Sequence, residues 1–238
     1  MMRRIFGGVL AATLLLAGFG AHAEDKLNPP HWQSQGALGS YDKAALQRGF
    51  LVYQTVCASC HAMTGLRYRD LQQLGFTPDE VAGIAAAVKQ PDGSAATLDD
   101  AFHDPHLPAS AFAGAKPPSL TNIENQRPHG VRYVYDLLTG YRAAPADVTL
   151  LPGHYFNAAY PGNQIAMPPV LKAHAVTYAD GTQATLPQEA SDVAAFLAWS
   201  ADPNLDARHE IGLRAIIFLV FLTVIAIASK RRVWREAV

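Results

Sequence analysis

The sequence Cys57-Ala58-Ser59-Cys60-His61 constrains this chain more than any other stretch. In the pattern C-x-x-C-H, two thiols add to the vinyl groups of a haem as thioethers, and the adjacent histidine faces the iron. The chain has no cysteines besides Cys57 and Cys60, so a disulfide framework is excluded and a zinc site would lack cysteine partners. A dithiol redox pair would need a βαβ setting that the sequence does not indicate. The motif therefore predicts one haem c, bound covalently through two thioethers.

The second axial ligand is open to a choice among methionine and several histidines. A thioether is usual where a haem works at high potential, and the chain has four methionines. Two lie at the extreme amino terminus, and Met63 follows His61 too closely to reach the opposite face of the ring. Met167 is left by elimination, in a sequence where Pro168 favours an extended backbone. The competing ligands are His103, His106, His129, His154 and His174.

Apolar segments stand at both ends of the chain. Residues 1–23 carry Arg3 and Arg4 near their start, continue with an apolar stretch and end in Ala-His-Ala, which is typical of a cleaved secretory signal. An uncleaved anchor is the alternative. Residues 211–229 contain fifteen apolar residues among nineteen, which as a helix would span the hydrocarbon core of a membrane. A buried core helix is the alternative for this second segment.

Charge is distributed unevenly along the 238 residues. Residues 230–238 carry four basic side chains, which predicts a cytoplasmic tail and places the preceding domain outside. That domain, residues 24–210, has a net charge of −7, although the whole chain carries only −1. The near-zero net charge of the whole chain excludes a nucleic-acid binder that works through bulk positive charge. An acidic tethered domain suits a basic soluble partner, and ordinary solubility explains the same excess.

Helix signals and turn signals alternate through residues 24–210. The expected helices, with caps at Ser40, Thr77 and Thr185 and a stop at Gly140, cover residues 41–58, 77–89, 130–139 and 185–200. Residues 90–120 and 142–184 are expected to be long loops, with a small hairpin around Asp180-Gly181. The chain is thus mainly α, a core of short helices with long loops. A few short helices supply little hydrophobic core for a chain of this length. A bulky apolar group is therefore expected to complete the core.

Several further stretches occur in the order of one known family. They are Arg67-Tyr68-Arg69, Pro117-Pro118-Ser119-Leu120, Asn125-Gln126-Arg127, Leu137-Leu138-Thr139-Gly140-Tyr141, Pro152-Gly153-His154-Tyr155-Phe156-Asn157 and Pro161-Gly162-Asn163-Gln164-Ile165-Ala166-Met167-Pro168-Pro169. With the haem motif they cover nearly all of the mature chain, which resembles the cytochrome c1 family, the haem subunits of quinol–cytochrome c reductase (the cytochrome bc1 complex). Phe112 and Ser119 depart from the family pattern, and the segment between residues 93 and 114 is shorter than in mitochondrial members.

The resemblance implies a set of site residues. It implies that His61 and Met167 are the axial ligands, that Arg127 pairs with a haem propionate, and that Tyr133 lies near the ring. An arginine beside a buried propionate forms a charge-assisted pair that makes burial of the haem tolerable. The alternatives are a surface ion pair for Arg127 and simple core packing for Tyr133.

The resemblance also implies a function and partners. The chain would carry one electron from a Rieske 2Fe–2S protein to a cytochrome c, in a dimeric complex with cytochrome b and the Rieske subunit. It would do no bond chemistry on its own and would sit in a bacterial inner membrane, with the haem domain in the periplasm. The rivals are a stand-alone anchored mono-haem cytochrome c feeding another oxidase or dehydrogenase, a haem enzyme or gas sensor with an open sixth position, and a structural anchor without haem.

Overall fold

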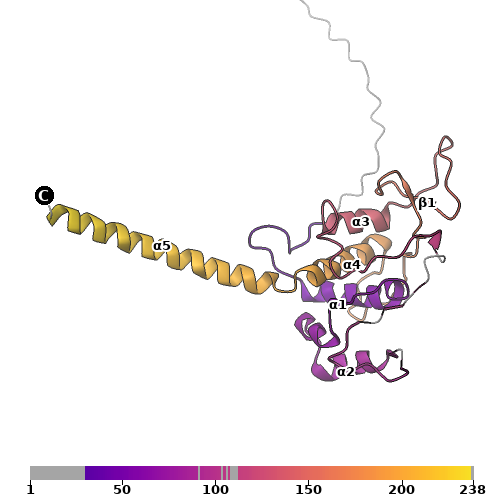
Figure 1. The fold of residues 1–238 in the computed structure, drawn as a ribbon, viewed down its shortest axis with the longest axis horizontal. Helices are drawn as coiled ribbons and strands as arrows, with labels where there is room; N and C mark the ends of the chain where they lie inside the picture. Colours follow the sequence, from indigo (N-terminus) through magenta and orange to yellow (C-terminus); the bar gives the residue numbers. More distant parts are fainter. Residues whose placement is uncertain (1–29, 91, 103, 106, 108–111, 237–238) are drawn as a thin grey trace, which may run out of the picture.

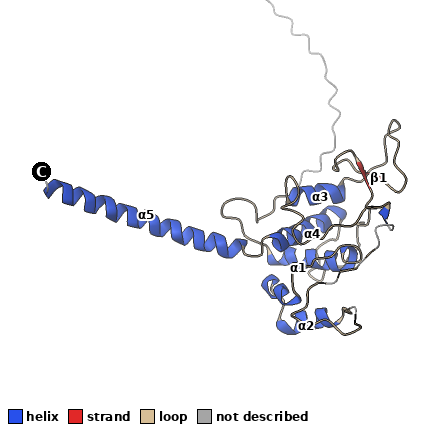
Figure 2. Ribbon diagram, viewed as in Figure 1, coloured by secondary structure: helices blue, strands red, loops and turns tan. Residues whose placement is uncertain are grey.

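Helices make up most of the regular structure, which the computed structural model describes for residues 30–236 except 91, 103, 106 and 108–111. In chain order the α-helices are α1 (Lys43–Val52), α2 (Pro78–Ala86), α3 (Val131–Thr139), α4 (Leu186–Ala201) and α5 (Leu205–Glu236). The short strands β1 (Tyr155–Phe156) and β2 (Gln164–Ile165) pair antiparallel (Figure 2). The prediction of a mainly α chain with short helices and long loops is confirmed. The predicted signal, residues 1–23, lies outside the described residues.

Helix α4 is the centre of the core, with α1 against it on one side and α3 on another (Figure 1). Gly49 allows the close approach of α1, because a Cβ at this position would clash with the main-chain carbonyl of Asp192. Beside this crossing the rings of Phe50 and Phe196 meet edge to face at 5.7 Å. Helices α1 and α4 are therefore closely packed, and Val193 and Leu197 of α4 line the cavity that the haem motif borders.

The haem motif begins where α1 ends. The helix continues as a wider π-helical turn, η1 (Tyr53–Cys57), which carries the chain into the motif. Such turns interrupt α-helices frequently at functional sites. A 3₁₀ helix, η2 (Tyr68–Leu74), follows and was not predicted; its first turn is closed by the Asp70 carboxylate, which accepts from the Arg67 N–H at 2.8 Å.

Two of the three predicted helix caps are present. Thr77 and Glu80 form a reciprocal capping box at α2, and the Thr185 hydroxyl accepts from the N–H of Gln188 at α4. The prediction of Ser40 as the first cap was wrong, because the Asp42 carboxylate accepts from the N–H of Ala44 and the helix begins at Lys43.

The hairpin expected around Asp180-Gly181 is not formed, and the prediction was wrong. Asp180 instead pairs with Arg48 of α1 at 2.8 Å, and the N–H of Val176 donates to the Glu189 carboxylate of α4 at 3.1 Å. These contacts hold the segment against helices, so its main chain has no strand partner. The hairpin lies earlier in the same loop region, where β1 pairs with β2 just before Met167.

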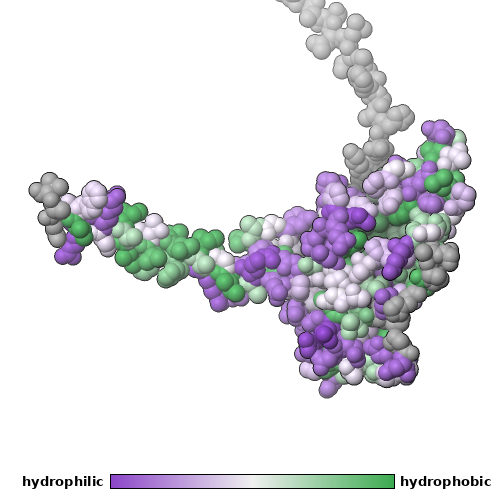
Figure 3. Space-filling view, viewed as in Figure 1, coloured by the Kyte–Doolittle hydropathy of each residue, from purple (hydrophilic) through white to green (hydrophobic). Residues whose placement is uncertain are grey.

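Helix α5 projects from the rest of the molecule as one long rod (Figure 1). It contains the predicted span 211–229 and is long and apolar enough to cross a membrane. Its apolar side chains are exposed, and they form a continuous hydrophobic surface between two hydrophilic ends (Figure 3). At the first of these ends Arg214 pairs with Glu210 one turn earlier. The helix is therefore a candidate membrane anchor, as predicted.

Candidate functional site

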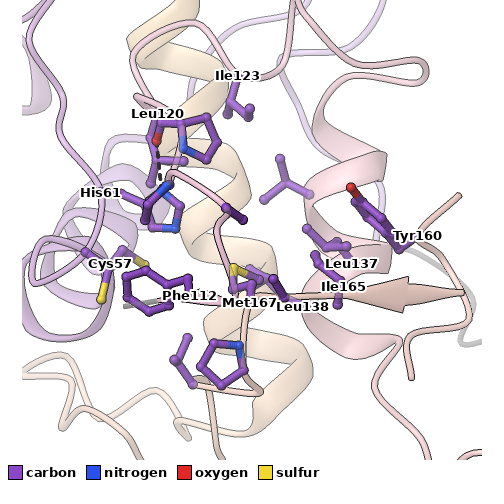
Figure 4. Close-up of a pocket in the computed structure, with 18 of the residues that line it drawn as sticks. Cys57, His61, Phe112, Leu120, Ile123, Leu137, Leu138, Tyr160, Ile165 and Met167 are labelled. Carbon is purple, nitrogen blue, oxygen red and sulfur yellow. Dashed lines mark hydrogen bonds between the residues drawn. The ribbon is translucent and has the colours of Figure 1, made fainter. Parts of the chain in front are cut away.

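A cavity of about 390 Å³ lies between the haem motif, α3, α4 and the loop that follows β2. Its lining is largely apolar, with Leu120, Ile123, Leu137 and Leu138 among the contributing side chains. Figure 4 shows His61 and Cys57 entering from one side, Leu137 and Leu138 from α3 on the other, and Met167 between them. Its size is within the range of about 300–1,000 Å³ typical of cofactor pockets. An apolar cavity of this kind leaves room for the bulky apolar group that was expected to complete the core.

All six residues predicted for the site line this one cavity. They come from three separated stretches of the chain and are Cys57, Cys60, His61, Arg127, Tyr133 and Met167. Residues 106 positions apart in sequence, His61 and Met167, therefore border the same space. The roles given to these side chains remain predictions, but their placement fits a haem held between an imidazole and a thioether.

The His61 ring is held by its neighbours in a fixed orientation. Its Nδ1 lies 2.8 Å from the carbonyl oxygen of Pro118, to which it donates when Nδ1 carries the proton. Nε2 then has a free lone pair, the arrangement that metal-binding histidines adopt. Burial lowers the pKa of His61, so the imidazole is neutral at neutral pH. The main chain is fastened beside it, since Tyr53 donates to the His61 carbonyl at 3.3 Å.

Both cysteines of the motif line the cavity wall. Burial raises the pKa of the Cys57 thiol to about 12, with the neighbouring Cys60 as a smaller cause, so Cys57 is protonated at neutral pH. A neutral thiol is a slow nucleophile in disulfide exchange. Among the described residues no cluster of three His, Cys, Asp or Glu side chains is placed to hold a metal ion alone. Neither observation indicates a zinc site or a reactive dithiol, and thioether attachment of a haem stays a prediction.

Met167 belongs to a loop that forms a whole wall of the cavity. Gln164, Ile165, Ala166 and Pro168 line the same space on either side of it. The hydroxyl of Tyr141 donates to the Met167 carbonyl oxygen at 2.9 Å, which fixes the main chain at this residue. Met167 therefore lies on a segment whose main chain is held by a hydrogen bond from Tyr141.

Arg127 and Tyr133 lie together at the cavity edge. The Arg127 guanidinium is 5.9 Å from the centre of the Tyr133 ring, within the range of a cation–π contact. Arg127 is exposed and Tyr133 is half-buried. A cation at the rim of an apolar cavity suits an anionic propionate, which the resemblance implied for Arg127.

Of the competing histidines that the structure describes, His154 also borders the cavity. Its Nδ1 lies 3.1 Å from the carbonyl of Pro152. His129 and His174 are not among the lining residues, and both have a positive φ, 68° and 63°. His103 and His106 lie outside the described residues. The placement of His154 at the cavity was not predicted, because the sequence does not show which of the competing histidines the fold brings beside the haem motif.

A buried carboxyl group stands behind the wall that carries Ile123. Glu124 is 7% exposed, and its Oε1 has no hydrogen-bond partner among the described residues. Burial raises the pKa of Glu124 from its ordinary value of 4.5 to about 9, so it is neutral at physiological pH. A single sequence gives no signal for this group, because burial of a lone glutamate depends on the tertiary packing.

Comparison with known proteins places the chain in a family. The sequence model of the Cytochrome C1 family matches residues 32–237. Cytochrome c1 of Rhodospirillum rubrum is 38% identical, over 96% of both chains. A mitochondrial cytochrome c1 haem protein of Arabidopsis thaliana is 41% identical, over 88% of this chain and 73% of that one. A mitochondrial protein of Candida albicans named as the catalytic subunit of the cytochrome b-c1 complex is 36% identical, over 89% of this chain and 79% of that one. The chain belongs to the cytochrome C1 family.

Proposed function

We propose that this chain is the cytochrome c1 subunit of a quinol–cytochrome c reductase, and that it passes single electrons from a Rieske 2Fe–2S protein to a cytochrome c. The observation that carries the proposal is the meeting of the haem motif and Met167 on one apolar cavity, in a chain of this family. The name of the Candida albicans relative, a subunit of the cytochrome b-c1 complex, supports the assignment to that complex.

One haem c would occupy the cavity, joined to Cys57 and Cys60 by thioethers and held axially by His61 and Met167. When bound, the haem supplies a one-electron couple, whose potential depends on its axial ligands and on the polarity around it. The chain's own residues orient and shield it. Pro118 fixes the His61 ring, Tyr141 fixes the Met167 main chain, and the largely apolar lining would limit the access of water to the haem.

If His61 and Met167 both bind the iron, they would leave it no open position for oxygen, peroxide or another substrate. The subunit alone would then do no bond chemistry, and the oxidoreductase activity would belong to the complex. Arg127 would neutralise a propionate at the cavity rim, and Tyr133 would pack beside the ring, held by its contact with the guanidinium. Both roles are testable separately from the axial ligands.

The chain would be a single-pass protein of a bacterial inner membrane. In this proposal residues 1–23 are a signal peptide, residues 24–210 lie in the periplasm, residues 211–229 span the bilayer and residues 230–238 are cytoplasmic. The exposed apolar surface of α5 and the basic residues at its end support this orientation. Cytochrome b and the Rieske protein would be permanent partners in a dimeric complex. The net charge of −7 on residues 24–210 would favour a basic cytochrome c as acceptor.

Deletion of the chain tests the proposal in the membrane. Loss of quinol–cytochrome c reductase activity, with co-purification of cytochrome b and a Rieske protein on the tagged wild-type chain, is the expected result. Unchanged activity, or purification without cytochrome b, would favour a stand-alone anchored cytochrome. Binding of carbon monoxide by the native reduced protein would favour a haem enzyme or gas sensor instead.

A further inference from the structure

Tyr141 stands directly after α3 and reaches the loop that carries the proposed sulfur ligand. Its hydroxyl donates to the main-chain carbonyl oxygen of Met167 at 2.9 Å. We propose that Tyr141 is a positioning residue, whose hydrogen bond holds the Met167 main chain so that the thioether stays on the iron. The inference rests on the proposed ligation by Met167 and deepens it.

The Met167 loop has few hydrogen-bond donors of its own next to Met167. The pairing of β2 with β1 ends at Ile165, two residues before Met167. Pro168 and Pro169 follow, and neither has an N–H to donate to a neighbouring strand or turn. The Tyr141 hydroxyl therefore contributes a donor at the point where the loop's own main chain supplies few.

Tyr141 can hold the loop because its own position is fixed. Asn157, which is fully buried, donates from Nδ2 to the Leu137 carbonyl at 2.8 Å and accepts at Oδ1 from the N–H of Ala159 at 2.9 Å. The N–H of Ala158 donates to the Gly140 carbonyl at 2.9 Å. Gly140 makes this approach possible, since a Cβ there would lie 2.8 Å from Asn157 Oδ1 and 2.6 Å from a main-chain oxygen of α3.

Two attachments thus join α3 to the loop. Asn157 fastens the base of the β1–β2 hairpin, and Tyr141 fastens Met167 itself. Helix α3 also supplies Tyr133, Val134 and Leu137 to the opposite wall of the cavity. Movement of the Met167 main chain away from the cavity must break the Tyr141 hydrogen bond.

The size of the effect follows from the loss of one neutral hydrogen bond. Such a bond contributes about 1 kcal/mol net, so the equilibrium between bound and detached Met167 shifts about fivefold when it is removed. External imidazole occupies the iron in proportion to the detached fraction. Tyr141→Phe is therefore expected to bind imidazole about fivefold more tightly than the wild type.

The experiment uses the purified, haem-loaded full-length protein in its ferric form. Imidazole is titrated into the wild type, Tyr141→Phe and Tyr155→Phe while the weak red charge-transfer band of methionine-ligated haem is recorded. Tyr155 is the matched control, since it lies on the same hairpin, is 41% exposed, and loses the same oxygen atom. The expected result is loss of the band at about one fifth of the wild-type imidazole concentration for Tyr141→Phe, with Tyr155→Phe unchanged.

The outcomes separate this inference from the proposed function. A wild type without the charge-transfer band would overturn Met167 ligation and this inference together. A wild type with the band, and identical titrations for Tyr141→Phe and Tyr155→Phe, would overturn the inference alone. If Tyr141→Phe does not accumulate with haem, a ring-fluorinated tyrosine placed at that codon strengthens the donor without changing its shape. Weaker imidazole binding would then support the positioning role, and unchanged binding would overturn it.

Discussion

Replacement of Asn157 by alanine removes one of the two side-chain attachments between α3 and the Met167 loop. Asn157 is fully buried, and its side chain makes hydrogen bonds of 2.8 and 2.9 Å to main-chain groups of Leu137 and Ala159. Alanine cannot replace either bond; the Leu137 carbonyl keeps the Gly140 N–H as a donor at 3.4 Å, but the part-buried Ala159 N–H loses its acceptor. Each lost bond costs about 1 kcal/mol, and the part-buried Ala159 N–H left without its acceptor adds to that, so we expect a loss of about 3 kcal/mol.

A thermal shift measures this loss in detergent, where α5 stays folded and the haem domain unfolds. For a domain of this size about 3 kcal/mol corresponds to a fall in Tm of about 6–12 °C, followed by far-ultraviolet circular dichroism. Asn125→Ala is the matched control, because Asn125 is exposed and bonds another surface amide, that of Asn122. Its Tm is expected to stay within about 2 °C of the wild type.

Equal Tm values for Asn157→Ala and Asn125→Ala would refute this reasoning, since the loop would then not depend on the buried amide. The red charge-transfer band adds a local readout. In Asn157→Ala this band is expected to disappear below the temperature of global unfolding, because the loop detaches from α3 first. Simultaneous loss of both signals, as in a single transition, would contradict that order of events.

Three further substitutions test separate parts of the account. Met167→Leu is expected to keep the haem attached while lowering its reduction potential and admitting carbon monoxide, as recorded by redox titration and visible spectra; an unaltered potential would rule out ligation by Met167. Cys57→Ser is expected to weaken or abolish covalent attachment, and full wild-type haem staining on a denaturing gel would contradict this. For Glu124 the unfolded chain releases its proton near pH 4.5 and the folded chain near pH 9, so stability falls as pH rises between these values. Relative to Glu124→Gln, the wild type is expected to lose up to about 1.4 kcal/mol per pH unit from pH 5 to 8 in urea titrations, and parallel stability curves would contradict the burial argument.

Much of the candidate site was predictable because it depends on local patterns and on the types of residue that can bind iron. The C-x-x-C-H spacing identifies Cys57, Cys60 and His61 without knowledge of the fold. Met167 followed by elimination, and the structure brings it to the same cavity as the motif. The helix caps at Thr77 and Thr185 are likewise local, since each hydroxyl bonds an N–H three residues on.

The remainder depends on contacts between distant segments. Tyr141 and Asn157 act through hydrogen bonds that span 26 and 20 residues, and no sequence period marks such pairs. Asp180-Gly181 has the composition of a hairpin turn, but the ion pair with Arg48 and the docking against α4 determine its conformation. Two acceptors, Ser40 and Asp42, could cap α1, and the sequence does not rank them.

The identity of the two axial ligands is the central claim, and His154 at the cavity wall is its sharpest competitor. Near-infrared magnetic circular dichroism of the ferric full-length protein at neutral pH measures it directly, because the position of the charge-transfer band differs between thioether and imidazole ligation. The account predicts the signature of one histidine and one methionine. A bis-histidine signature, or that of a haem with a vacant sixth position, would contradict it.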